Sequence, residues 1–164
     1  MEVLEIISSK MEMAQHFLDD LLSNYDRLDD TARIDRANVV FDNITSYLQI
    51  EQNLLFPYIR KTGEHDDILE QALAVHDRID EEMEKSVMVH VDEPDHQFYH
   101  GLDTIRGLLE RAKRIDQEMI FPWARVYLSE EDHYALLNPL KEQTAHETVA
   151  PLAWQQAMFR EKGG

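Results

Sequence analysis

Two acidic residues stand where the helical pattern of the chain requires apolar side chains. Glu51 and Asp116 each begin a short repeat, in which the acid and a glutamine precede apolar residues and then Phe-Pro. The repeated segments are residues 51–57 (EQNLLFP) and 116–122 (DQEMIFP). A carboxylate in an apolar environment is costly unless it is paired, protonated or bound to a metal. Two of them, related by a repeat, predict a buried polar site.

Two further polar side chains are predicted to face the same interior. On a helical wheel, Tyr47 lies one turn before Glu51, and His76 falls near the centre of the next segment's apolar stripe. Three segments therefore direct a carboxylate, an imidazole and a second carboxylate inward, with a phenol beside them. Carboxylates and imidazoles suit iron, manganese or zinc. We take Glu51, His76, Asp116 and Tyr47 as candidate metal ligands.

The same four residues allow a metal-free interpretation. They could form a hydrogen-bonded core network, which would need a shared proton because two carboxylates and one imidazolium leave a net buried charge. His16 is the natural fifth candidate ligand, from the first segment, although it falls roughly opposite that segment's apolar stripe. Both alternatives stay open at the level of sequence.

The elements that must position these residues are long amphipathic helices. Apolar residues recur with a period of 3.6 residues over segments 2–28, 34–61, 65–91 and 96–125. Ser129 to Asp132 have the pattern of a capping box that starts a fifth helical region, which Pro139 and Pro151 should break or kink. No segment alternates with period two. We expect an all-α, up-down-up-down four-helix bundle without a sheet.

The expected organisation is one domain, residues 1–164. The bundle takes about residues 1–128, and a C-terminal helical extension, 129–164, packs over one end or side. The formal net charge of −17 makes nucleic acid an improbable partner. The chain has no cysteine, which fits a cytoplasmic location, and no signal peptide or membrane-spanning run is visible.

The chain resembles the hemerythrin-like (HHE cation-binding) family over roughly residues 1–135. The resemblance is carried by the two acid-xxx-apolar-Phe-Pro motifs, by residues 75–79 (VHDRI) and by residues 124–132 (ARVYLSEED). It implies a four-helix bundle with a non-haem di-iron centre, in which Glu51 and Asp116 correspond to the bridging carboxylates and His76 to the third-helix histidine. The family's histidine four residues before each carboxylate is Tyr47 or Ala112 here. Tyrosinate can ligate ferric iron, whereas alanine cannot.

Three functions follow as expectations. The first is a metal-binding protein with an altered non-haem iron or other divalent metal site, of one or two ions, that binds or senses O₂, NO or peroxide or handles iron. The second is a degenerate, metal-free bundle that acts as an interaction or structural module. An oxidase-type enzyme is the least favoured, because no separate substrate-binding motif is visible. A homodimer or another protein partner stays open.

Overall fold

The structure is a computed structural model that describes residues 2–89 and 96–145, and all of its regular elements are helical. The described residues contain no strand, which confirms the all-α class within them. The α-helices are α1 (Glu2–Asn24), α2 (Asp30–Ile50), α3 (Phe56–Thr62), α4 (Asp66–Met88), α5 (Gln97–Ile115), α6 (Phe121–Tyr127) and α7 (Glu130–Ala145). In the described part, no helix is both long and apolar enough to cross a membrane.

Each of the two repeated motifs folds as a π-helical turn inside a long helix. The π turns Glu51–Leu55 and Asp116–Ile120 join α2 to α3 and α5 to α6. Pro57 and Pro122 stand in the first turn of α3 and of α6, where they have no N–H to donate to the preceding turn. The backbone N–H of the preceding phenylalanine instead reaches the carbonyl of Glu51 or of Asp116, five residues back. The repeat in sequence is therefore also a repeat in backbone geometry.

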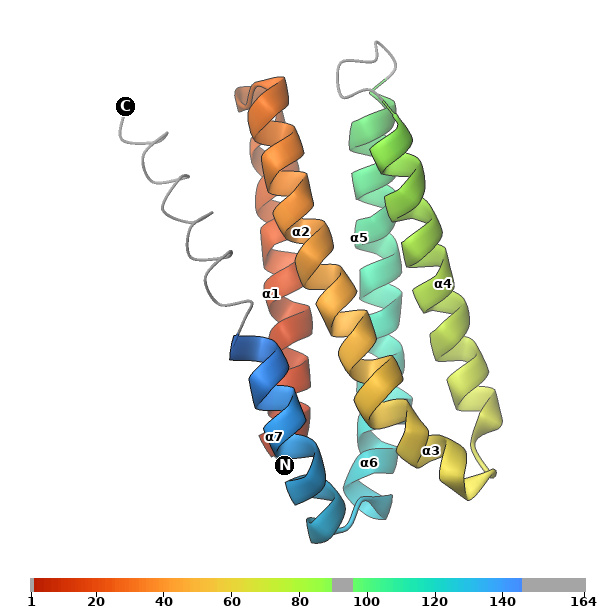
Figure 1. Cartoon of the computed structure of the whole chain (residues 1–164). Helices are drawn as coiled ribbons and strands as arrows, with labels where there is room; N and C mark the ends of the chain where they lie inside the picture. The colour runs from red at the N-terminus through yellow and green to blue at the C-terminus, as the bar shows by residue number, and fades with distance from the viewer. Residues whose placement is uncertain (1, 90–95, 146–164) are drawn as a thin grey trace.

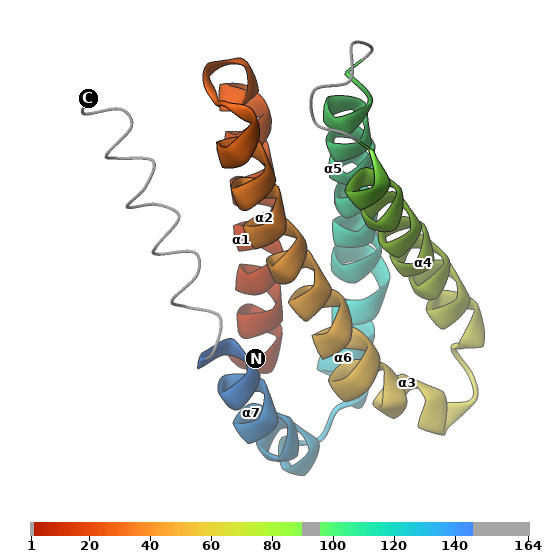
Figure 2. The same ribbon diagram turned by 45° about the horizontal axis from the view of Figure 1, so that its top comes forward.

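The long helices lie side by side and alternate in direction (Figures 1 and 2). Helix α1 packs on α2, α4 packs on α5, and α1 also contacts α5. Helix α7 returns along α1 and touches both α2 and the first π turn. One continuous apolar core fills the space between these helices. The α2–π–α3 and α5–π–α6 rods thus bring their acidic residues into a shared interior.

The helix ends follow local capping chemistry. The second helix begins at Asp30 rather than at residue 34, because the Asp29 side chain accepts a hydrogen bond of 2.8 Å from the Ala32 backbone N–H. The predicted capping box before α7 is confirmed: the Ser129 hydroxyl accepts from the Asp132 N–H at 3.0 Å, and the Asp132 carboxylate accepts from the Ser129 N–H at 3.1 Å.

The structure tests the prediction about Pro139 but not the one about Pro151. Pro139 was expected to break or kink the fifth helical region, but α7 continues past it to Ala145, so a break at this position is wrong. Pro151 and the remainder of the C-terminal extension lie outside the described residues, as does the predicted end of the third helix at residue 91. Helix α4 ends at Met88, where Val89 turns to an extended conformation.

Candidate functional site

Glu51 is a carboxyl group wholly enclosed by the core. It begins the first π turn, is 0% exposed, and neither of its carboxylate oxygens makes a hydrogen bond to the described residues. His76 Nε2 lies 3.4 Å from Glu51 Oε1. An enclosed carboxylate without hydrogen-bond donors is among the most unfavourable arrangements in a protein core.

Asp116 is the counterpart of Glu51 in the second π turn and is also buried, at 1% exposed. Its Oδ2 atom is hydrogen-bonded to the hydroxyl of Tyr47, a fully buried residue of α2. This bond joins the α2 rod to the α5 rod across the interior. It also gives Asp116 the partner that Glu51 lacks.

His76 reaches the cluster from α4 and is held on three sides. Its Nδ1 lies 2.9 Å from Gln52 Nε2, its Nε2 faces Glu51, and its ring stacks on that of Phe56 with 5.4 Å between the ring centroids. The Tyr47 ring is 6.2 Å away, centroid to centroid. The four residues Tyr47, Glu51, His76 and Asp116 therefore lie together, as their positions on the helical wheel predict.

Burial dominates the protonation of this cluster. It raises the pKa of Glu51 to about 7, and contact with Asp116 and Tyr47 lowers it only in part. Burial and then the Glu51 charge raise the pKa of Asp116 well above its usual range. The pKa of Tyr47 is likewise raised by burial, so its hydroxyl keeps its proton and can donate to a carboxylate. The two carboxyl groups thus cannot both ionise easily.

The imidazole is neutral at physiological pH. Burial lowers the pKa of His76 to about 4, although the nearby Asp116 carboxylate acts in the opposite direction. The contact between His76 and Glu51 is therefore not an ion pair at neutral pH. We refer to Tyr47, Glu51, His76 and Asp116 from here on as the buried cluster.

His16 does not belong to the buried cluster, so its inclusion among the candidate ligands is wrong. Its side chain is 64% exposed and lies 3.2 Å from the Asp20 carboxylate, one turn along α1. The residues of α1 that face the core nearby are Met11, Ala14 and Leu18, all fully buried. The amphipathic pattern of α1 explains the result, since a residue opposite the apolar stripe must face solvent.

Sequence reasoning missed Gln52 and Phe56 as parts of the site. Both belong to the first repeated motif and both contact the His76 ring. The glutamine recurs as Gln117 in the second motif, but Gln117 is exposed whereas Gln52 is half-buried. The glutamine that occurs in both motifs was a signal in the sequence. Which of the two glutamines faces inward, however, depends on the neighbouring helix.

The side chains of the buried cluster are of types that bind divalent cations, but their present arrangement does not form a coordination site. Two buried carboxyl groups, an imidazole and a phenol form a donor set of the kind that binds iron, manganese or zinc. In residues 2–89 and 96–145, however, no group of three or more His, Asp or Glu residues is arranged so that it could hold a metal ion. Tyr47 is engaged with Asp116, and a donating N–H on His76 Nε2 would oppose coordination.

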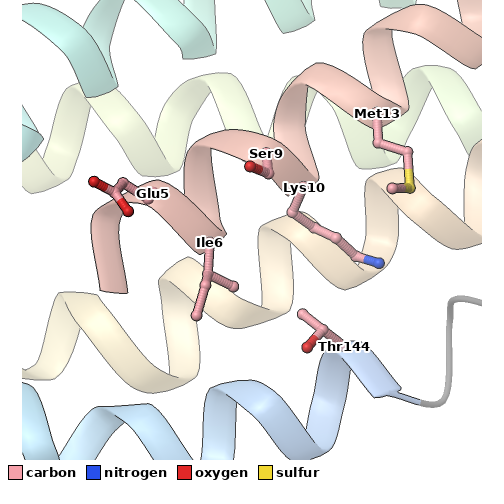
Figure 3. A pocket seen from close by; sticks show the side chains of 6 residues that line it. All are labelled: Glu5, Ile6, Ser9, Lys10, Met13 and Thr144. Carbon is pink, nitrogen blue, oxygen red and sulfur yellow. The ribbon is translucent and has the colours of Figure 1, made fainter. Parts of the chain in front are cut away.

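One surface cavity lies away from the buried cluster. It has a volume of about 250 Å³ and is lined by one face of α1 and by the end of α7 (Figure 3). Its lining residues are Glu5, Ile6, Ser9, Lys10, Met13 and Thr144. None of them belongs to the buried cluster, so the cavity is not an opening to it.

Comparison of the chain with protein-family models, with curated proteins and with solved structures gives no match.

Proposed function

We propose that the buried cluster is a metal site and that the protein binds a divalent cation there, with iron, manganese and zinc as the candidate ions. The observation that carries this proposal is Glu51, a carboxylate with no exposed surface whose two oxygens make no well-formed hydrogen bond to the described residues, although Asp116 and Tyr47 lie against it. A cation would compensate its charge and that of Asp116 at the same time. Glu51, His76 and Asp116 would hold the ion, with Tyr47 beside them.

The arrangement of the helices supports a hemerythrin-like form of this site. Four antiparallel rods, with α7 as an extension, correspond to an up-down-up-down four-helix bundle whose facing helices supply core ligands. The π turns add support, because such turns occur frequently at functional sites. Tyr47 and Ala112 replace two histidines of the family pattern, so the proposed site has fewer nitrogen ligands.

A site with few protein ligands suits the binding of a small molecule. Ala112 is buried and offers no ligand atom, which would leave part of the ion's coordination to other groups. Metal sites that act on or sense small molecules keep such positions available. We therefore propose that the bound metal serves in binding or sensing O₂, NO or peroxide, or in handling iron. A bound metal would supply a Lewis-acidic or redox-active centre.

Metal analysis combined with thermal unfolding tests the proposal. Protein purified without a chelating tag should contain a stoichiometric metal, and adding Fe²⁺, Mn²⁺ or Zn²⁺ to chelator-treated protein should raise its Tm through binding to the folded state. Glu51→Gln should abolish this gain. His16→Ala is the matched control, because it removes a histidine outside the cluster and should leave metal binding unchanged.

A second candidate is a metal-free bundle that acts as an interaction or structural module. The observation that favours it is the hydrogen bond between Tyr47 and Asp116, which satisfies one carboxyl group without a metal. In that case the two carboxyl groups share protons, and no divalent ion changes the Tm. A wild type that gains nothing from any of the three ions would decide for this candidate.

A further inference from the structure

Gln52 is a polar neighbour of the buried cluster to which the proposed function assigns no role. Its Nε2 atom lies 2.9 Å from His76 Nδ1. An amide NH₂ group can only donate, so Nδ1 accepts and the proton of the neutral imidazole is on Nε2. That proton is on the nitrogen that lies 3.4 Å from Glu51 Oε1, a contact that is not aligned as a hydrogen bond. The orientation of the Gln52 amide therefore determines which nitrogen of His76 carries the proton.

If the oxygen of the Gln52 amide faced His76 instead, the imidazole proton would be on Nδ1. A half-turn of the amide exchanges its NH₂ group for its oxygen, which can only accept. Nδ1 would then carry the proton, and Nε2 would present a lone pair toward Glu51. A histidine binds a metal through such a lone pair. The hydrogen-bond partner of its other ring nitrogen determines which nitrogen carries that lone pair.

Gln52 is well placed to influence His76, because Gln52 and the preceding residue, Glu51, contact opposite sides of the His76 ring. Gln52 and Glu51 are consecutive in the π turn, and they face the two different nitrogens of His76. Phe56 stacks on the imidazole face and restrains the ring plane. With the ring held in this way, the Gln52 amide at Nδ1 and the Glu51 carboxyl group at Nε2 are the two groups that bias the choice of protonated nitrogen.

We propose that Gln52 is a positioning residue that sets the tautomer of His76, and that a half-turn of its amide converts His76 Nε2 from a hydrogen-bond donor into a metal ligand. The first part concerns the metal-free protein alone. The second part rests on the proposed metal-binding function. The two parts need separate measurements.

The first measurement is NMR of the imidazole nitrogens in chelator-treated protein above about pH 7.5, where ordinary histidines are neutral. We expect wild-type His76 to carry its proton on Nε2. Gln52→Glu should move the proton to Nδ1, because a carboxylate only accepts, and Gln52→Leu should weaken the preference to what Glu51 alone imposes. Gln117→Glu and Gln117→Leu are the matched controls, since they make the same changes at the exposed copy of the motif.

The tautomer part is overturned if wild-type His76 carries its proton on Nδ1, or if Gln52→Glu leaves it on Nε2. A wild-type proton on Nδ1 overturns this part even if a variant fails to fold, and the shift in Gln52→Glu separates the effect of Gln52 from that of Glu51. A change in fold alone would not move the proton from one nitrogen to the other, so the measurement separates positioning from general stability.

The second measurement is the affinity of each chelator-treated variant for Mn²⁺ or Zn²⁺. We expect Gln52→Glu to bind about tenfold more tightly than wild type and Gln52→Leu about tenfold more weakly, as for other partners of ligating histidines. The Gln117 variants should match wild type, which also controls for added charge. Equal affinities across the Gln52 series overturn the second part. If wild type itself binds neither ion, the proposed function fails, while the NMR result stands.

Discussion

At the scale of single residues, the two carboxyl groups of the buried cluster differ in their surroundings. Asp116 has the Tyr47 hydroxyl as a partner, whereas Glu51 has no hydrogen bond to the described residues. Burial raises the pKa of both groups, and the charge of Glu51 adds to the effect on Asp116. Replacing one or the other therefore has different consequences with and without metal.

We expect Asp116→Asn to be tolerated in the metal-free protein. The amide keeps an acceptor for Tyr47 and removes the competition for protons with Glu51, so the free energy of unfolding should change little or rise by about 1 kcal/mol. In the presence of metal the variant should lose the Tm gain of wild type. Urea unfolding with and without Mn²⁺ measures both effects. Glu118→Gln, an exposed change nearby, is the control; a loss of several kcal/mol in metal-free Asp116→Asn would contradict this account.

The pH dependence of stability follows from the same groups. Above the ordinary histidine pKa of about 6.5, His76 is neutral in both the folded and unfolded states. The folded protein still holds a proton on Glu51 up to about pH 7, where the unfolded chain has lost it, and the raised pKa of Asp116 acts in the same direction. Stability should therefore fall as pH rises from about 6.5 through the Glu51 pKa of about 7, with a slope of at most about 1.4 kcal/mol per pH unit for each proton.

Below the ordinary histidine pKa, His76 acts in the opposite direction. The unfolded chain then binds a proton on His76 that the folded protein, with its pKa of about 4, does not. This contribution makes stability rise with pH between about 4 and 6.5. Denaturant melts of chelator-treated protein across both ranges measure the sum. The double variant Glu51→Gln/Asp116→Asn should show a nearly flat profile above pH 6.5; a slope equal to that of wild type would show that other groups are responsible.

At the scale of elements, the same local structure occurs twice in the chain. An acid, a π turn and a proline in the first turn of the next helix occur in both long rods, so each buried carboxyl group stands directly at a change in helical geometry. The other element boundaries depend on ordinary capping. Gly63, for example, ends α3 with φ of 66°, a left-handed conformation that favours glycine.

The capping box before α7 offers a direct test of element stability. Ser129→Ala removes the hydroxyl that accepts from the Asp132 N–H, and we expect it to lower the free energy of unfolding by about 1 kcal/mol. Glu131→Ala, an exposed change in the first turn of the same helix, controls for the loss of a polar side chain. Urea unfolding measures both variants. Equal stability of wild type and Ser129→Ala would show that α7 unfolds independently of the rest.

At the scale of the whole molecule, net charge opposes compactness. With a formal net charge of −17, the folded chain repels itself, and salt screens this repulsion. We expect the Tm to rise when NaCl is increased from about 0.02 to 0.2 M, over which the screening length falls from roughly 20 Å to below 10 Å. Neutralising the exposed residues Asp19 and Glu81 as Asn and Gln should reduce the salt effect. A Tm that falls with salt would mean that attractive surface pairs outweigh the repulsion.

The sequence by itself determined the helices and the inward positions of four polar residues. A period of 3.6 residues depends only on local geometry, and it placed Tyr47, Glu51, His76 and Asp116 on faces that the structure buries together. The same reasoning set His16 against the apolar stripe, and the structure leaves it exposed. Whether the cluster holds a metal stays a prediction, because ligand type alone does not determine coordination.

Only the tertiary structure decided how the cluster is connected. The sequence contains glutamine in both motifs, but among the described residues only Gln52 contacts an imidazole, because α4 presents His76 to the first π turn. The π turns themselves were not predicted, since a pattern read at a constant angle per residue does not register a local widening of the helix. The hydrogen bond between Tyr47 and Asp116 joins residues 69 positions apart. Such contacts depend on how the helices pack against one another, which the pattern of a single segment does not determine.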